Sequence, residues 1–113
     1  MTCLFCEIID RNIPADIVFE DDEILAFRDV DPRAPVHILI IPKKHISGLS
    51  EANESDRELM GRICIAASRI AGQEGIDQSG YRLVVNSGPD AGQAVDHLHF
   101  HLLGGRPLGW PPG

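Results

Sequence analysis

Apolar and polar residues alternate over residues 97–103 (HLHFHLL), where histidine occupies every second position. Successive side chains of an extended chain point to opposite faces, so a period of two predicts a β-strand. One face of this strand would carry Leu98, Phe100 and Leu102, and the other would carry all three histidines. A helix would spread the histidines around its axis, so only the strand gives them a common site.

The pattern elsewhere predicts a short helical turn and four further strands. Phe5, Ile8 and Ile9 recur at helical spacing, which predicts the turn within residues 3–10. β-Branched and apolar runs bounded by proline, glycine or acidic residues predict strands. These runs cover residues 17–20, 24–28, 36–41 and 81–86.

One long amphipathic helix is expected between the third and fourth strands. Ser55 and Glu58 match a capping box, so we expect the helix to begin at Ser55. Gly72 and Gly75 should close it after four to five turns. Its buried positions would be Leu59, Ile63, Ala66, Ala67 and Ile70. Cys64 is expected to be a small core residue of the same helix.

The order of these elements indicates one α+β domain over residues 1–113. The expected architecture is a five-stranded, mainly antiparallel sheet with one long helix and a short N-terminal helix. The long helix would cover one face of the sheet. Because strand 36–41 is apolar on both faces except for His37, we expect the second face to be buried as well, which favours a homodimer.

Charge and cysteine content exclude several classes of function. The 113-residue chain has a net charge of −7, which argues against nucleic acid or an anionic membrane as the main partner. No apolar run reaches the length of a membrane span, and the first residues lack the pattern of a signal peptide. Three cysteines, an odd number, indicate a reducing compartment, so we expect a cytoplasmic location.

The row of histidines suits chemistry on a phosphate better than a metal site. At a rise of about 3.3 Å per residue, His97 and His101 lie about 13 Å apart, too far to share one ion. The middle residue, His99, is the best candidate for a nucleophile, and His101 for a general acid. A glycine-rich loop precedes the strand, and its backbone N–H groups are candidate donors to phosphate oxygens. These donors belong to Gly92, Gln93, Ala94 and Val95.

These residues resemble a known family. Residues 97–103 have the alternating histidine and apolar pattern of the histidine-triad superfamily. More narrowly, the chain resembles the histidine-triad nucleotide-binding branch, whose members are purine nucleoside phosphoramidases. The matching motifs are IPA at 13–15, FEDD at 19–22, AFRD at 26–29, PVH at 35–37, IPKKHI at 41–46, VN at 85–86, GQ at 92–93, GG at 104–105 and WPPG at 110–113.

The resemblance implies a hydrolase that cleaves the P–N bond of purine nucleoside 5′-phosphoramidates and releases AMP or GMP. His99 would attack the α-phosphorus to give a covalent nucleotidyl-histidine, and His101 would assist the leaving amine. His97 and His37 would support the site and set tautomers, and Asp29 would accept hydrogen bonds from the ribose. The resemblance places Leu4, Phe5, Ile8, Phe27 and Val30 around the purine, and Asn86 with the backbone of residues 92–94 at the ribose and phosphate.

Two alternatives stay open at this point. One is a dinucleoside-polyphosphate hydrolase or nucleotidyltransferase of the same superfamily. The WPPG motif at 110–113 argues against this alternative. The other is a nucleotide-binding interaction module without important turnover. The chain also departs from many members of the branch, because Ala94 replaces a serine before the triad. Losing that donor would cost about 1 kcal/mol if the hydroxyl is used in the transition state, which predicts an altered rate.

A second candidate site involves the pair Cys3 and Cys6. Zinc in a structural site takes four thiolate or imidazole ligands. His45 and His97 would complete such a set, and some histidine-triad proteins with this N-terminal pair resemble that arrangement. Other members of the branch lack the cysteines and need no metal, so the resemblance implies no cofactor for catalysis and a zinc that is structural.

Overall fold

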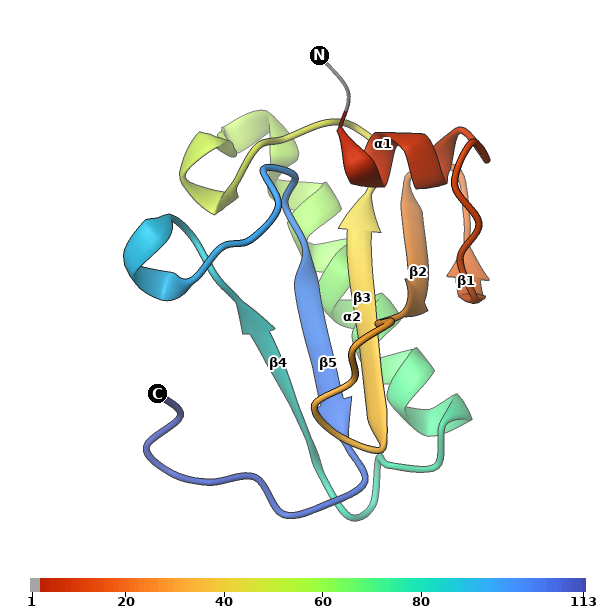
Figure 1. Cartoon of the computed structure of the whole chain (residues 1–113), viewed down its shortest axis with the longest axis vertical. Coiled ribbons are helices and arrows are strands. Elements are labelled where there is room, and N and C mark those ends of the chain that lie inside the picture. The colour runs from red at the N-terminus through yellow and green to blue at the C-terminus, as the bar shows by residue number, and fades with distance from the viewer. Residues whose placement is uncertain (1–2) are drawn as a thin grey trace.

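Seven regular elements organise the chain in a computed structural model that describes residues 3–113. Their bounds are α1 (Leu4–Ile9), β1 (Ile17–Glu20), β2 (Ile24–Arg28), β3 (Val36–Pro42), α2 (Arg57–Gln73), β4 (Tyr81–Val85) and β5 (Phe100–Gly104). The strands form one antiparallel sheet in the order β1-β2-β3-β5-β4. Figure 1 shows α2 behind this sheet and α1 at one end of it. The predicted α+β architecture is confirmed.

Helix α2 covers one face of the sheet and forms the larger part of the core. Its period places Ile63 and Ile70 against the sheet, and both are buried. The strands contribute alternate residues to this cluster, such as Ile38 and Ile40 from β3. Leu98, Phe100 and Leu102 belong to the same cluster, as the alternating pattern predicts.

The opposite face carries the histidines and is partly covered by α1. Here β3 presents the other half of its residues, including His37, Leu39 and Ile41. Leu39 and Ile41 pack with Phe5 and Ile8 of α1 in a second apolar cluster. The short helix therefore closes one end of the histidine-bearing face. Among residues 3–113, no helix is long and apolar enough to cross a membrane.

Three local expectations are wrong. The capping box is formed two residues earlier, where the Asn53 side chain accepts from the N–H of Ser55 and the Asp56 side chain accepts from the N–H of Asn53. Helix α2 therefore begins after Asp56, because a short 3-10 turn comes first. Cys64 is exposed, since a helical period that buries its neighbour Ile63 turns it outward. The hydrogen-bonded strand β5 begins only at Phe100, so the first two triad histidines precede it.

Candidate active site

The three triad histidines share one face, and each has a different environment. His97 is completely buried, His99 is 5% exposed, and His101 is half-buried. The imidazole rings of His99 and His101 lie with their centroids 5.1 Å apart. His37 reaches the group from β3, because its partner in the sheet is Leu103, two residues beyond His101. His37 of β3, His101 of β5 and His99, which precedes β5, thus form one cluster of rings.

A hydrogen bond to the backbone fixes the protonation of one ring nitrogen of His99. Its Nδ1 lies 2.7 Å from the carbonyl oxygen of His97, in a buried hydrogen bond. Because a carbonyl only accepts, Nδ1 must carry the proton. In the neutral ring, Nε2 then keeps a free lone pair. A neutral imidazole held in this tautomer is a nucleophile ready to attack through Nε2.

A chain of hydrogen bonds also sets the tautomer of His101. The backbone N–H of Arg33 donates to His37 Nδ1 at 3.0 Å, so the neutral His37 ring carries its proton on Nε2. That Nε2 donates to His101 Nδ1 at 2.9 Å. The neutral His101 ring consequently holds its own proton on Nε2. His101 can present this N–H to a phosphate oxygen or a leaving group.

Burial keeps the His37 and His101 rings uncharged near neutral pH. Burial lowers the pKa of His101 to about 4, and repulsion from His99 and His37 adds to the effect while Asp29 opposes it. Burial is also the main cause of the lowered pKa of His37, against the nearby Asp29 carboxylate. The negative charge of a bound phosphate would raise the pKa of a neighbouring imidazole and favour its acid form.

Asp29 approaches the cluster, but the tautomers argue against a metal ion there. One Asp29 carboxylate oxygen lies 3.4 Å from His37 Nε2, and the ligand atoms of Asp29, His37 and His101 lie within 4.8 Å of one another. Binding a metal through His37 Nε2 would move the proton to Nδ1, which would then face the N–H of Arg33. We therefore interpret this group as a hydrogen-bonded chain.

The loop before the triad is held in shape by its own backbone and by one side chain. The N–H groups of Gly92 and Gln93, predicted as donors to phosphate, already donate to the carbonyls of Pro89 and Gly88 at 3.0 and 3.2 Å. Gln93 donates to the carbonyls of Ser47 and Val95, at 2.7 and 3.0 Å, and accepts from the N–H of Gly88 at 2.9 Å. Gly92 has a φ of 78°, which an L side chain rarely adopts. Gln93 thus acts on the shape of the loop. Asn86, at the end of β4, is half-buried, and Ala94 is exposed.

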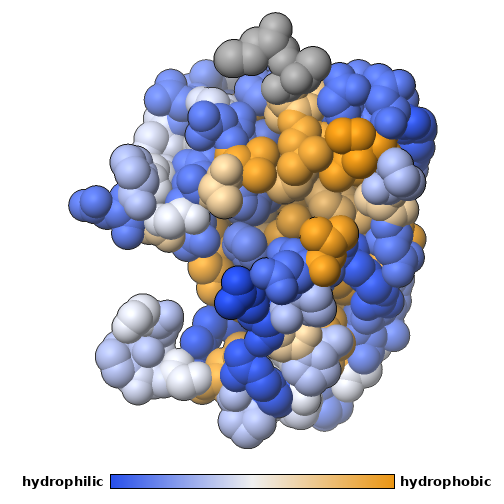
Figure 2. All heavy atoms as spheres, in the orientation of Figure 1, coloured by the Kyte–Doolittle hydropathy of each residue, from blue (hydrophilic) through white to orange (hydrophobic). Residues whose placement is uncertain are grey.

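The residues predicted around the purine divide into two groups. Phe5, Ile8 and Phe27 are buried together. The Phe5 ring lies edge-on to His99, with centroids 5.2 Å apart, so this apolar cluster reaches the predicted nucleophile. Leu4 is 48% exposed and Val30 is fully exposed. In Figure 2, hydrophobic atoms gather at the end of the molecule where Figure 1 places α1.

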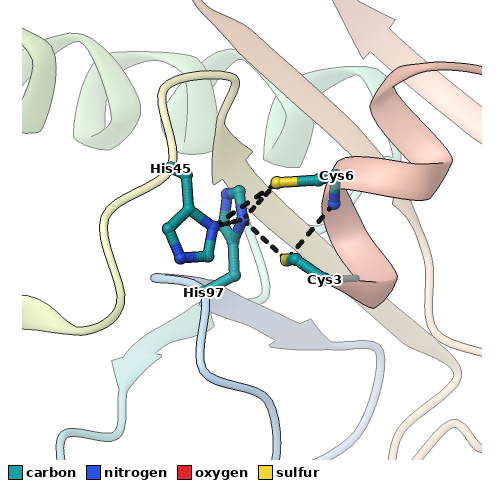
Figure 3. A group of neighbouring side chains, drawn as sticks. All are labelled: Cys3, Cys6, His45 and His97. Atoms are coloured by element: carbon teal, nitrogen blue, oxygen red, sulfur yellow. Dashed lines mark hydrogen bonds between the residues drawn. The ribbon is translucent and has the colours of Figure 1, made fainter. Parts of the chain in front are cut away.

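A second cluster brings together residues from distant parts of the chain. Figure 3 shows Cys3 and Cys6 of the α1 region facing the rings of His45 and His97. His97 Nδ1 lies 3.3 Å from Cys3 Sγ, 3.6 Å from Cys6 Sγ and 3.2 Å from His45 Nδ1. Cys6 Sγ lies 3.4 Å from His45 Nδ1. The four residues predicted as ligands therefore lie together, with their ligand atoms within 4.8 Å of one another.

The geometry of this cluster fits zinc. A tetrahedral ion with bonds of about 2.0–2.3 Å holds its ligand atoms about 3.3–3.8 Å apart, close to the observed separations. His97 Nε2 donates to the carbonyl of Pro42 at 2.8 Å, so its Nδ1 is free to bind metal. Burial raises the pKa of the Cys6 thiol to about 11, and a bound metal ion would lower this pKa and favour the thiolate.

Two parts of the site were missed by the sequence interpretation. They are the N–H of Arg33, which fixes His37, and the carbonyl of Pro42, which fixes His97. Both are backbone groups, so residue type carries no signal for them.

Comparison with known proteins identifies the family of this chain. Residues 10–108 match the HIT domain family, so this chain belongs to that family, and the resemblance to the histidine-triad superfamily is confirmed.

Individual relatives cover nearly the whole chain. An uncharacterized HIT-like protein of Synechococcus elongatus is 58% identical over 110 residues, which are 97% of this chain and 96% of that protein. The crystal structure of a HIT family hydrolase from Legionella pneumophila has a TM-score of 0.97 at 54% identity, covering 99% and 100% of the two chains. A histidine triad nucleotide-binding protein from Candida albicans has a TM-score of 0.77 at 31% identity, covering 97% and 83%.

Proposed function

We propose that this protein is a hydrolase that cleaves the P–N bond of purine nucleoside 5′-phosphoramidates. The observation that carries the proposal is the fixed tautomer of His99. Its Nδ1–H is donated to the His97 carbonyl, which leaves Nε2 as a nucleophile on the same face as the His101 ring. Relatives named as HIT family hydrolases and as a nucleotide-binding protein support the reaction class and the ligand class.

The reaction would proceed in two displacements at phosphorus. His99 Nε2 attacks the α-phosphorus, a bond forms between them, and the P–N bond to the amine breaks. The bound phosphate favours the protonated form of His101, which delivers its Nε2 proton to the leaving amine. Water then attacks the phosphorus of the nucleotidyl-histidine while the now neutral His101 accepts its proton. The bond between phosphorus and His99 Nε2 breaks, which releases the nucleoside monophosphate and restores His99. No metal ion takes part in either step.

The decisive experiment compares wild-type protein and His99→Ala with adenosine 5′-phosphoramidate. We expect AMP release and a transient AMP adduct on the wild-type protein, seen by intact-protein mass spectrometry. His99→Ala should lose at least about a thousandfold in turnover while still binding AMP. Arg57→Ala, an exposed change on α2, is the matched control and should keep full activity.

Two other outcomes would contradict this proposal and favour one of the alternative functions. Faster cleavage of a dinucleoside polyphosphate than of the phosphoramidate would favour the alternative hydrolase or transferase. AMP binding without turnover by either protein would favour the interaction module.

We also propose that Cys3, Cys6, His45 and His97 bind one structural zinc ion. The fit of their separations to a tetrahedral site supports this. The test is metal analysis together with cobalt substitution, because tetrahedral Co²⁺ bound to thiolate has intense visible absorption. Wild-type protein should bind one equivalent, and Cys6→Ser should lose the absorption and unfold at lower temperature. Equal thermal stability with and without a chelator would refute a structural role.

A homodimer is the expected assembly. β4 is an edge strand of the sheet, and its residues Tyr81–Val85 are exposed or half-buried. An apolar edge strand of this kind pairs readily with another chain. Sedimentation velocity should show a dimer, and a monomer at all concentrations would refute this expectation.

A further inference from the structure

Helix α1 is fastened to the sheet by few polar contacts. Among residues 3–113, each hydrogen bond that joins residues 3–10 to the chain beyond residue 13 involves Cys3 or Cys6. The partners of the two cysteines are the rings of His45 and His97, which follow β3 and precede β5 (Figure 3). A helix of six residues is not stable by itself in water, so α1 depends on these contacts and on apolar packing.

The same turn of helix carries part of the predicted purine site. Phe5 lies between the two cysteines in the sequence and is buried. Its ring lies edge-on to His97, with centroids 5.9 Å apart, and to His99, with centroids 5.2 Å apart. The position of Phe5 beside the predicted nucleophile therefore depends on how firmly Cys3 and Cys6 hold α1.

The two thiols are placed to react with each other. Cys3 is the N-cap of α1, and its Sγ accepts from the N–H of Cys6 at 3.4 Å. The two sulfur atoms lie within 4.8 Å of each other, so a disulfide bond requires only side-chain rotation and a small backbone shift. Both residues are half-buried and line a cavity of about 1070 Å³, which gives a small oxidant access to the sulfurs.

We propose that Cys3 and Cys6 form a reversible oxidation site that controls nucleotide binding. The inference rests on the proposed function, since weaker nucleotide binding is its consequence. The oxidant class is a peroxide. One thiolate attacks a peroxide oxygen, the O–O bond breaks, and a sulfenic acid and water result. The second thiolate attacks that sulfur, the S–O bond breaks, and a disulfide and a second water result. A dithiol reductant restores both thiols by exchange and is itself oxidised to a disulfide.

The disulfide removes the contacts that hold α1. Neither sulfur then carries an S–H to donate to His97 Nδ1, and neither is a thiolate that can bind a metal ion. A zinc ion held by this cluster would therefore be released. Helix α1 keeps only the apolar contacts of Phe5 and Ile8 with the sheet. We expect α1 to leave the sheet in most oxidised molecules, so nucleotide binding must first restore its position and becomes weaker.

The first experiment measures release of α1 and does not depend on activity. It uses zinc-loaded, full-length Cys64→Ser protein, because the exposed thiol of Cys64 would also react with peroxide. Hydrogen peroxide should lower the mass by about 2 Da and free one equivalent of zinc, measured with a chromogenic chelator. Amide exchange over residues 4–9 should become about tenfold faster while exchange at Ile63 of α2 stays unchanged, and dithiothreitol should reverse both changes.

The second experiment measures AMP affinity by calorimetry. Oxidised Cys64→Ser protein should bind AMP about tenfold more weakly than the reduced protein, which should match wild type. The matched control combines Cys3→Ser with Cys64→Ser and cannot form the disulfide. Peroxide should leave its AMP affinity unchanged, whatever that affinity is before treatment. An equal loss in this control would mean general oxidative damage and would overturn the inference.

The two proposals fail in different ways. The oxidation site is refuted if peroxide gives no disulfide between Cys3 and Cys6, if the disulfide leaves exchange in α1 unchanged, or if oxidised and reduced protein bind AMP equally well. Reduced protein that binds no AMP would instead overturn the proposed function, and with it the control of nucleotide binding, while amide exchange would still decide whether the disulfide releases α1.

Discussion

The lowered pKa of His101 predicts a specific loss of stability in mild acid. In the unfolded chain, the His101 ring takes up a proton near its ordinary pKa of 6.5. In the folded protein, the same ring takes it up only near pH 4. The unfolded state therefore binds more protons between these values. Stability is complete above pH 6.5 and is lost as the pH falls toward 4.

The size of the effect follows from linkage. Between about pH 7 and about pH 5, the difference between the two pKa values lowers the free energy of unfolding by at most about 2 kcal/mol. Because solvent screens a half-buried ring, we expect a loss of about 1 kcal/mol. His101→Asn tests the prediction well, because the asparagine Oδ1 can still accept from His37 while the titration disappears.

The assay is urea unfolding of both proteins at the two pH values. Carboxylates and the other histidines are common to both proteins, so their contributions cancel in the comparison. Wild-type protein should lose about 1 kcal/mol more than His101→Asn on acidification. If both lose the same free energy of unfolding, His101 is not held neutral by its surroundings.

Two further changes test packing and catalysis. Gly104→Ala would place a Cβ 2.6 Å from Ile76 Cδ1, so it should destabilise the protein by about 1–3 kcal/mol. Gly61→Ala on α2 has nothing within 4 Å of the added Cβ, so it should stabilise the protein by about 0.5–1 kcal/mol. Thermal unfolding of the two variants tests both predictions. Ala94→Ser restores a hydroxyl to the exposed loop before the triad and should raise kcat for the phosphoramidate by about three- to tenfold, and an unchanged kcat would show that the hydroxyl does not reach the transition state.

Most of the helices and strands, and the faces that they bury, could be predicted from the amino-acid sequence alone. The alternation over residues 97–103 predicted that Leu98 and Phe100 enter the core while the histidines face away, and both residues lie in the core cluster. Helical spacing identified Ile63 and Ile70 as the inner face of the long helix. Such patterns succeed because strand and helix periods are local properties of the backbone. The same helical period, applied to Cys64, would have placed it outside.

The hydrogen-bond partner of each histidine, in contrast, depends on how the chain folds in three dimensions. Cys3 and His97 are 94 residues apart in the chain, and His37 and His101 are 64 apart. The structure brings the four residues predicted as zinc ligands together and places His37 beside His101. The tautomers of the histidines depend on backbone groups of His97, Arg33 and Pro42. Every residue type has such groups, so no pattern of side chains can indicate which carbonyl or N–H the fold brings to a given ring nitrogen.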